Sequence, residues 1–342
     1  MNTFPFELGP IRPVDEAASL LIRTTRGCPW NRCEFCVNYK DMEFSLRSLE
    51  EIKQDIAAAA DYYGSDVFET CFLQDGDSFL MKTAELVALL TFLKQKFPGL
   101  KRISSYGRAQ TMIRKSAEEM QAICLVGLNK LYCGMESGSD KVLKKVNKGV
   151  TASDISTSSR RAKEAGMSIS EFIILGLGGQ ELWQEHARET AKVLNEINPH
   201  FIRVLTIGVK PGSGLLRQME AGEYTLQTEK NIIEEQRLLI ENLSGITSHY
   251  ANHHAVDLLT ETRGQFPRDK PRLLAIMDRY LSLTEEDRMN FTLGKRLGIY
   301  QQLDDMNRAH LHKEVDAQLL KIRASHSGQM EEIFHHLRAQ IV

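Results

Sequence analysis

The sequence predicts an α/β fold, a partial (β/α)6 barrel of the TIM type, followed by a helical C-terminal extension. Apolar, β-branched segments alternate six times with segments of helical periodicity, which requires a parallel sheet with helices outside it. Polar or glycine-rich turns follow the predicted strands, and from about residue 216 the pattern changes to helices with polar connections. We therefore expect an N-terminal segment over residues 1–17, a barrel over residues 18–215 and an extension over residues 216–342.

Each element is predicted from its own residues. Hydrophobic runs bounded by turn residues predict six strands, at about residues 20–22, 67–73, 102–105, 128–135, 169–175 and 201–207. Helical spacing predicts the helices between them, at about residues 48–63, 83–97, 116–127, 153–165 and 181–196. Two of these helices begin with a capping box, Ser48 with Glu51 and Ser116 with Glu119. Further helices are expected at about residues 229–243 and 270–281, and near the C-terminus.

Half of the six cysteines lie within nine residues, on a loop that is expected to leave the first strand. They are Cys28, Cys33 and Cys36, and glycine and proline around them break regular structure. Thiolates are the standard ligands of cluster iron, so the loop favours an iron–sulfur cluster. A structural zinc would want a fourth ligand, and no Cys or His lies nearby to supply it. The remaining cysteines lie inside apolar stretches, as is typical of core packing: Cys71, Cys124 and Cys133.

The composition disfavours several classes of protein. The formal net charge is −2 and no long basic run occurs, so the signature of a dedicated nucleic-acid binder is missing and nucleic acid is not the expected partner. The N-terminus has no basic segment followed by an apolar one, and the longest apolar span, residues 86–93, is too short for a bilayer. We expect a soluble, cytoplasmic protein, since thiols stay reduced in that compartment.

The turns with chemical character fall at one edge of the predicted sheet. In barrels of parallel strands the reaction takes place at the carboxyl ends of the strands. The notable turns at that edge are residues 28–36, 74–78, 106–108, 136–139 and 176–180. Glu136 ends an apolar strand, where a buried carboxylate is costly without partners, so a ligand contact is favoured there.

These motifs, in this order, resemble those of the radical S-adenosylmethionine (SAM) enzymes over about residues 18–215. The branch that they resemble contains oxygen-independent coproporphyrinogen oxidases, methylthiotransferases and the Elongator catalytic subunit. The resemblance implies a [4Fe-4S] cluster whose open iron chelates SAM, and cleavage of SAM to a 5′-deoxyadenosyl radical. It also implies an oxidoreductase or transferase with a small-molecule or other unidentified substrate. A reducing partner such as flavodoxin or ferredoxin is implied as well.

The resemblance assigns roles residue by residue. Cys28, Cys33 and Cys36 are implied as the cluster ligands. The implied SAM contacts are an aromatic residue of the cysteine loop, the glycine-rich turn after the second strand, the polar end of the fourth strand with a following lysine, and the turn after the fifth strand. These residues are Phe35, Asp75, Gly76, Asp77, Glu136, Ser137, Lys148 and Gly176. In the turn at residues 75–77 the backbone carbonyls are the groups implied to meet the methionine amino group.

The chain also departs from the family pattern. Four and then two residues separate its cysteines, where relatives have three and two. Ser105-Tyr106 and Phe172 stand where coproporphyrinogen oxidases carry acidic residues, which disfavours porphyrinogen oxidation. Two alternatives stay open. One is a trafficking protein that binds a cluster and haem without turnover, and the other is a zinc-stabilised interaction module.

Two further groups are candidates for the substrate side of the site. Arg108 follows the third strand and would suit a carboxylate, although an ordinary surface ion pair is the alternative. Residues 249–254 carry three histidines, which would contribute to a substrate pocket if the extension folds over the barrel mouth. A structural histidine pair is the alternative there.

Overall fold

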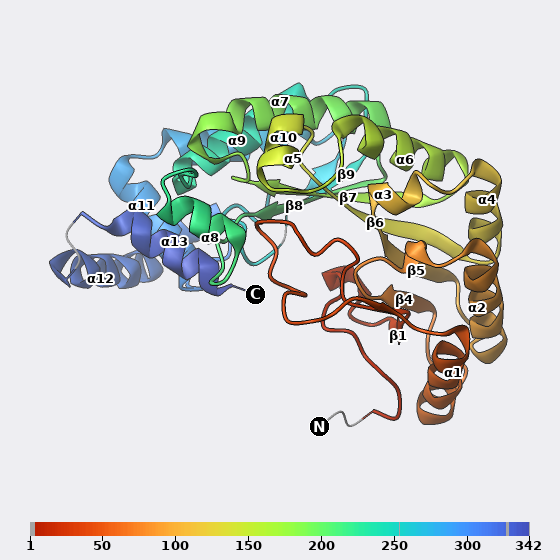
Figure 1. Ribbon diagram of the computed structural model, residues 1–342. Coiled ribbons are helices and arrows are strands. Elements are labelled where there is room, and N and C mark those ends of the chain that lie inside the picture. The colour runs from red at the N-terminus through yellow and green to blue at the C-terminus, as the bar shows by residue number, and fades with distance from the viewer. Residues whose placement is uncertain (1–3, 253, 326–327, 342) are drawn as a thin grey trace. The chain divides into compact units, whose positions relative to one another are not determined.

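The computed structural model describes residues 4–252, 254–325 and 328–341 (Figure 1). The chain forms two compact units. The first unit comprises residues 1–135 and 149–171, and the second comprises residues 136–148 and 172–342. The boundaries predicted at residues 18 and 216 stay predictions.

The first unit contains four parallel strands with helices between them. They are β1 (Leu20–Arg23), β4 (Thr70–Gln74), β5 (Arg102–Gly107) and β6 (Leu128–Glu136), paired in that order. The helices are α1 (Leu49–Tyr63), α2 (Thr83–Lys96), α3 (Ala109–Met112), α4 (Ala117–Leu125) and α6 (Ala152–Glu164). A small antiparallel pair, β2 (Thr25–Arg26) with β3 (Ser45–Leu46), follows β1.

Local sequence signals set the helix ends in this unit. The Ser48 hydroxyl accepts a hydrogen bond from the Glu51 amide at 3.2 Å, and the Glu51 carboxylate accepts one from the Ser48 amide at 2.8 Å. The capping box of α1 is therefore confirmed. The same pair of contacts joins Ser116 and Glu119 at the start of α4. Such caps satisfy amide groups that have no partner within the helix.

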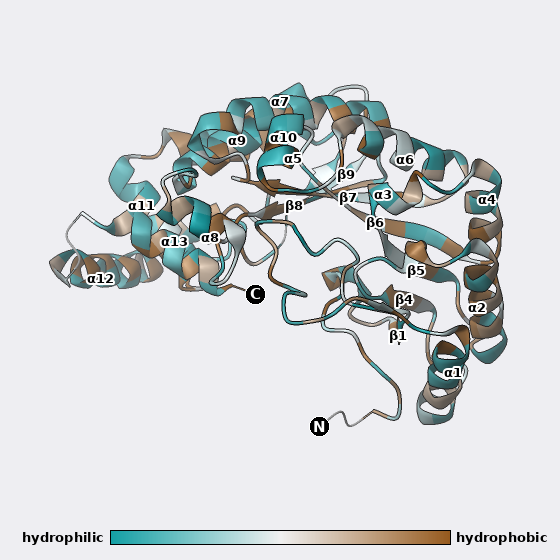
Figure 2. Cartoon of the chain, viewed as in Figure 1, coloured by the Kyte–Doolittle hydropathy of each residue, from teal (hydrophilic) through white to brown (hydrophobic). Residues whose placement is uncertain are grey.

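The core of the first unit lies between the strands and one face of each helix. Figure 2 shows hydrophobic and hydrophilic bands along α2, as expected for a helix with one buried face. The buried residues of α2 are Leu86, Leu89, Leu90 and Leu93. Cys71 and Cys133 are buried as predicted, and burial raises the pKa of the Cys71 thiol well above its usual value. Cys124 is only half-buried, because it lies in the last turn of α4.

The second unit receives β7 (Ser168–Leu175), which begins in the first unit, and adds β8 (Phe201–Thr206). Its helices are α5 (Asp140–Lys145), α7 (Gly179–Ile197), α8 (Gly214–Glu220), α9 (Glu229–Asn242), α10 (Lys270–Ser282), α11 (Glu285–Arg296), α12 (Ala309–Ser325) and α13 (Met330–Gln340). Short 3-10 helices at Val14–Glu16, Ser78–Leu80 and Leu303–Asn307 complete the regular structure of both units. Parallel strands alternate with helices, so the predicted α/β class is confirmed.

Two strands in the second unit were not predicted. Residues 249–254 were expected to be a polar connection, but His249–Ala251 forms β9, which pairs in parallel with β8. Gly264–Gln265 forms β10, which pairs antiparallel with β9. Three residues are too few to show the two-residue period of a strand, so only the pairing of these residues with β8 reveals β9. His253 lies outside the described residues. In the described part of the chain, no helix combines the length and apolar character needed to cross a membrane.

Candidate functional site

The three clustered cysteines lie on one loop of the first unit. The loop leaves β2 after Arg26 and returns at β3, and pairing of Arg26 with Ser45 closes its base. Cys28, Cys33 and Cys36 are each half-buried on it. The structure therefore confirms that the cysteines share a loop just after the first strand.

The donor atoms of this loop suit a cluster of iron and sulfide. Three thiol groups with partial exposure are the ligand type that cluster iron prefers. The Arg108 guanidinium donates a hydrogen bond to the Cys28 sulfur at 3.3 Å, and hydrogen bonds to ligand sulfurs set cluster potentials. Within residues 4–252, 254–325 and 328–341, no group of three or more His, Cys, Asp or Glu side chains is arranged to hold a metal ion. The cysteine loop therefore suits a cluster because it carries the right type of ligand and because the three thiols lie on the same loop.

Asp75 fastens the cysteine loop to the end of β4. Its buried carboxylate accepts hydrogen bonds from Arg23 Nε at 2.9 Å and Nη2 at 2.6 Å, from the Gly27 amide at 3.1 Å and from the Tyr39 hydroxyl at 3.0 Å. Burial and the Asp75 charge raise the pKa of Tyr39. Gly27 and Tyr39 lie on either side of the three cysteines in sequence, so one carboxylate holds both ends of the cysteine segment.

Gly76 lets the turn after β4 touch the loop. A Cβ atom at this position would lie 2.8 Å from the Gly27 carbonyl oxygen and 2.9 Å from the Cys28 Cα. Distances this short to backbone atoms leave no room for a side chain. The structure therefore brings the predicted glycine-rich turn into direct contact with the first cysteine.

Asp77 is buried and only partly satisfied. One carboxylate oxygen accepts a hydrogen bond from the Thr111 hydroxyl at 2.6 Å, while the other has no hydrogen-bond partner among the described residues. Burial raises the pKa of Asp77 to about 7. The Thr111 hydroxyl and the backbone amides of Phe79 and Arg108 oppose this rise.

In the second unit, Glu136 and Lys148 form an ion pair. Lys148 Nζ lies 2.8 Å from Glu136 Oε1, and each side chain is 11% exposed. Glu136 has a left-handed backbone with φ of 62°, which points to a constrained position for a non-glycine residue. Ser137 is buried beside it. The structure thus pairs two residues for which the resemblance implies contacts with SAM.

Gly176 belongs to a buried network that sequence reasoning missed. Its amide donates to the Glu235 carboxylate at 3.1 Å, and Glu235 Oε1 lies 2.8 Å from His186 Nδ1. His186 Nε2 lies 3.2 Å from the Glu136 carbonyl oxygen. Gln227 also donates to Glu235, at 2.6 Å. The network links the backbones of two predicted SAM contacts.

A sequence signal for this network did exist. Glu235 shares the buried face of α9 with Ile232 and Leu239, at helical spacing. Glutamate is almost never fully buried unless it is paired, so a charge on an apolar face indicates a partner. The sequence could not name that partner, because His186 lies on α7, 49 positions away.

Three helices of the second unit converge on a second buried carboxylate. Arg296 of α11 donates to Glu229 of α9 through Nε at 3.1 Å and Nη2 at 2.8 Å. Arg338 of α13 is 1% exposed, and its Nη1 lies 3.4 Å from the same carboxylate. The Arg338 nitrogens have no hydrogen-bond partner among the described residues. None of these three residues was among the predicted site residues.

Of the remaining predicted site residues, Phe35 is half-buried on the cysteine loop. Gly176 has φ of 83°, and the Tyr224 hydroxyl donates to its carbonyl oxygen at 2.5 Å. Their predicted contacts with SAM stay predictions.

Comparison with known proteins gives the family. The family model for the radical SAM superfamily matches residues 22–194, just over half of the chain. The heme chaperone HemW of Bacillus subtilis (strain 168) is 21% identical over 225 residues, which are 64% of this chain and 59% of that protein. A tRNA-2-methylthio-N(6)-dimethylallyladenosine synthase of Syntrophus aciditrophicus (strain SB) is 27% identical over 194 residues, 54% of this chain and 40% of that protein. The chain thus spans between 40% and 59% of the length of these relatives.

Among solved structures, coproporphyrinogen III oxidase (HemN) from Escherichia coli matches with a TM-score of 0.50 and 19% identity, over 66% of this chain and 52% of that one. This likeness shows the fold alone, which is the partial-barrel class predicted from the sequence. Since the family match covers just over half of its residues, the chain belongs to the radical SAM superfamily, and its cofactors are a [4Fe-4S] cluster and S-adenosylmethionine.

Proposed function

We propose that the chain is a radical SAM enzyme in which Cys28, Cys33 and Cys36 hold the cluster. The observation that carries the proposal is the contact between the cysteine loop and the turn after β4, made through Asp75 and Gly76. When bound, the cluster would supply the electron for cleavage of SAM to methionine and a 5′-deoxyadenosyl radical, and this radical would take a hydrogen atom from the substrate.

The proposed role of the residues of the first unit is to hold the cluster and to orient SAM. Arg108 holds the Cys28 sulfur through its hydrogen bond. The Asp77 carboxylate, together with the backbone carbonyls of the turn at residues 75–77, would accept hydrogen bonds from the ammonium group of SAM. Phe35 would pack near the adenine.

The resemblance also implies SAM contacts for residues of the second unit. Lys148 would meet the carboxylate of SAM, Glu136 and Ser137 would contact its polar groups, and Gly176 would flank the adenine. His186 and Glu235 fix the backbone at Glu136 and Gly176. The region after residue 215 selects the substrate, and a flavodoxin or ferredoxin delivers the electron.

Serine substitution of each loop cysteine tests this function. After anaerobic reconstitution, the wild-type chain is expected to carry about four irons and to release 5′-deoxyadenosine from SAM under dithionite. Cys28→Ser, Cys33→Ser and Cys36→Ser are expected to lose both, because each removes one thiolate ligand. Cys124→Ser, a half-buried cysteine away from the loop, is the matched control. A loop variant with wild-type iron and turnover would refute the ligand assignment.

A second function is haem trafficking without turnover. It is favoured by the similarity to the Bacillus subtilis protein named as a heme chaperone. Haem titration separates the two functions. Stoichiometric haem binding, together with no formation of 5′-deoxyadenosine by the reconstituted chain, would support trafficking over catalysis.

A further inference from the structure

The N-terminal segment at residues 4–11, named here the N-terminal strap, is fastened to the first unit along its length. Phe6 is buried, and its ring lies 5.7 Å from that of Tyr63 on α1. The Gly9 amide donates to Gln74 Oε1 at 3.0 Å, and Gln74 Nε2 donates to the carbonyls of Gly9 and Ile11 at 3.2 and 3.1 Å. These contacts join the strap to the end of β4, one residue before Asp75.

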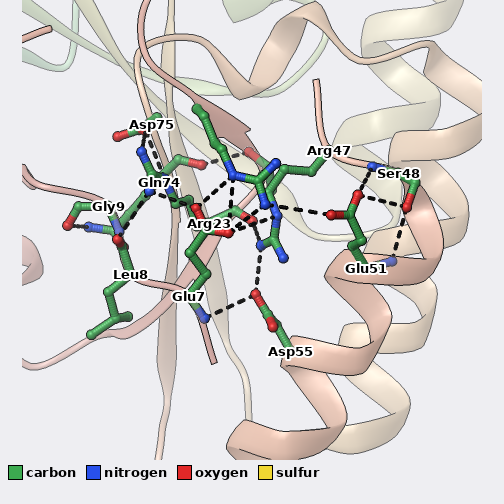
Figure 3. Close-up of polar contacts among 12 residues, drawn as sticks. Glu7, Leu8, Gly9, Arg23, Arg47, Ser48, Glu51, Asp55, Gln74 and Asp75 are labelled. Atoms are coloured by element: carbon green, nitrogen blue, oxygen red, sulfur yellow. Dashed lines mark hydrogen bonds and ion pairs between the residues drawn. The ribbon is translucent and has the colours of Figure 1, made fainter. Parts of the chain in front are cut away.

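Between these anchors, Glu7 contacts three arginines. Its carboxylate accepts hydrogen bonds from Arg23 Nη1 at 2.7 Å and from Arg26 Nε at 2.9 Å and Nη2 at 2.6 Å. Arg47 Nε lies 3.6 Å away. Figure 3 shows Glu7 facing Arg23 and Arg47, with Asp55 beside them. One carboxylate from the strap is therefore the shared counter-ion of three guanidinium groups.

The three arginines mark the base of the cysteine loop. Arg23 ends β1, Arg26 ends β2 where the loop begins, and Arg47 follows β3 where the loop returns. The side chains of Arg23 and Arg47 are only 8% and 4% exposed, so their charges depend on nearby carboxylates. The negative charge of Glu7 thus lies where the loop leaves and re-enters the sheet.

Arg23 extends this contact into the loop itself. Its Nη1 bonds Glu7, while its Nε and Nη2 bond Asp75, which in turn accepts the Gly27 amide and the Tyr39 hydroxyl. A continuous path of charged hydrogen bonds therefore runs from the strap to both sides of the three cysteines. Bonds of this kind are about twice as strong as neutral ones.

The charge state of Glu7 agrees with this geometry. Burial raises its pKa, but the hydrogen bond from Arg26 and the charges of Arg47 and Arg23 outweigh burial and hold the pKa below its usual value. Glu7 is therefore the anionic member of the cluster of arginines.

We infer that Glu7 is a positioning residue for the cluster: through Arg23 and Arg26, the N-terminal strap holds the cysteine loop in shape to receive iron. The inference rests on the proposed role of the loop cysteines as ligands. Without the Glu7 charge, Arg26 loses its forked partner, and Arg23 and Arg47 keep only Asp75 and Asp55. The base of the loop loosens and the cysteines become easier to reach.

Cysteine labelling of the full-length chain tests the inference without any metal. In the iron-free protein, Glu7→Gln is expected to raise the alkylation rates of Cys28, Cys33 and Cys36 by iodoacetamide about tenfold, the effect of losing one charged hydrogen bond. Glu50→Gln is the matched control, because Glu50 is an exposed carboxylate of the same unit. Peptide mass spectrometry gives the rate at each cysteine.

Buried Cys71 and Cys133 report global unfolding in the same experiment. If Glu7→Gln raises their rates too, Arg26→Lys replaces it. This milder change breaks the fork between Arg26 and Glu7, together with the longer contact of Arg26 with Glu51 at 3.5 Å, and is expected to raise the rates at the loop cysteines alone. After reconstitution, the variant that stays folded should release iron to a chelator about tenfold faster than wild type.

The outcomes separate the two proposals. Wild-type rates at all three loop cysteines in a folded variant, with wild-type iron release, overturn the role of Glu7. A wild-type chain that takes up no iron overturns the proposed function instead, while the labelling rates still report on the strap.

Discussion

At the residue scale, Gly76 controls how closely the turn after β4 approaches the cysteine loop. Its backbone lies against Gly27 and Cys28 with no space for a Cβ. Gly99 is a useful contrast, because a Cβ there would meet only the Phe68 carbonyl oxygen, at an ordinary 3.6 Å. Comparing replacements at Gly76 and Gly99 therefore distinguishes loss of close packing at the site from the general effect of replacing a glycine.

We predict that Gly76→Ala lowers the iron content of the reconstituted chain severalfold, because the methyl group displaces Cys28. Overpacking of this kind costs about 1–3 kcal/mol. Gly99→Ala should keep wild-type iron content. Iron analysis with urea unfolding of both variants checks the prediction, and equal iron content in the two would contradict it.

The buried carboxyl of Asp257 predicts how the stability of the protein depends on pH. It is buried, accepts a hydrogen bond from the Thr206 hydroxyl at 2.9 Å, and its other oxygen has no hydrogen-bond partner in the described chain. Burial raises its pKa to about 8. The native state therefore binds this proton more tightly than the unfolded state, so Asp257 lowers the free energy of unfolding as pH rises from about 4 to about 8.

Asp257→Asn should remove this slope and stabilise the protein at pH 8 relative to wild type by more than about 1 kcal/mol, the equivalent of one pKa unit. Urea unfolding at several pH values measures it. Asp66→Asn, at an exposed position, serves as the control. If the free energy of unfolding of Asp257→Asn depends on pH as in the wild type, the Asp257 carboxyl is not the source of that dependence.

At the scale of elements, α9, α11 and α13 share one buried carboxylate, but their arginines contribute unequally. Arg296 makes a forked contact with Glu229, whereas Arg338 approaches it only to 3.4 Å. Burial lowers the pKa of Arg338, which reflects the cost of holding its charge there. We therefore assign the pairing energy mainly to the contact between α9 and α11.

Arg296→Met should lower the free energy of unfolding by about 3–5 kcal/mol, because it leaves Glu229 without its forked partner. Arg338→Met should cost much less, since it removes a buried charge that makes no hydrogen bond among the described residues. Chemical unfolding of both variants compares them. An equal decrease in the free energy of unfolding in the two variants would contradict the unequal roles of Arg296 and Arg338.

At the scale of the whole molecule, the charge balance bears on the kind of substrate. One relative is named as a tRNA-modifying synthase, yet the net charge of this chain is only −2, with 43 basic and 45 acidic residues. Binding to nucleic acid draws mainly on clustered basic side chains.

We predict that the reconstituted chain does not retain bulk tRNA in filter binding at about 150 mM salt. The same assay in low salt is the comparison, because weak electrostatic contact appears there first. Retention at the higher salt would instead favour an RNA substrate.

Local patterns determined much of this protein in advance. Hydrophobic periodicity predicted the alternating strands and helices, the capping boxes at Ser48 and Ser116 predicted two helix starts, and three cysteines gathered on one loop indicated a cluster. These signals lie within a few residues of one another, so the sequence alone carries them.

Only the tertiary structure decided which distant residues support the site. Glu7 meets Arg47 across 40 positions, Asp75 meets Gly27 across 48, and His186 meets Glu235 across 49. The sequence showed each of these side chains but not its partner. Such pairings form when separate elements pack together, and burial then makes each charge depend on a neighbour that no local pattern names.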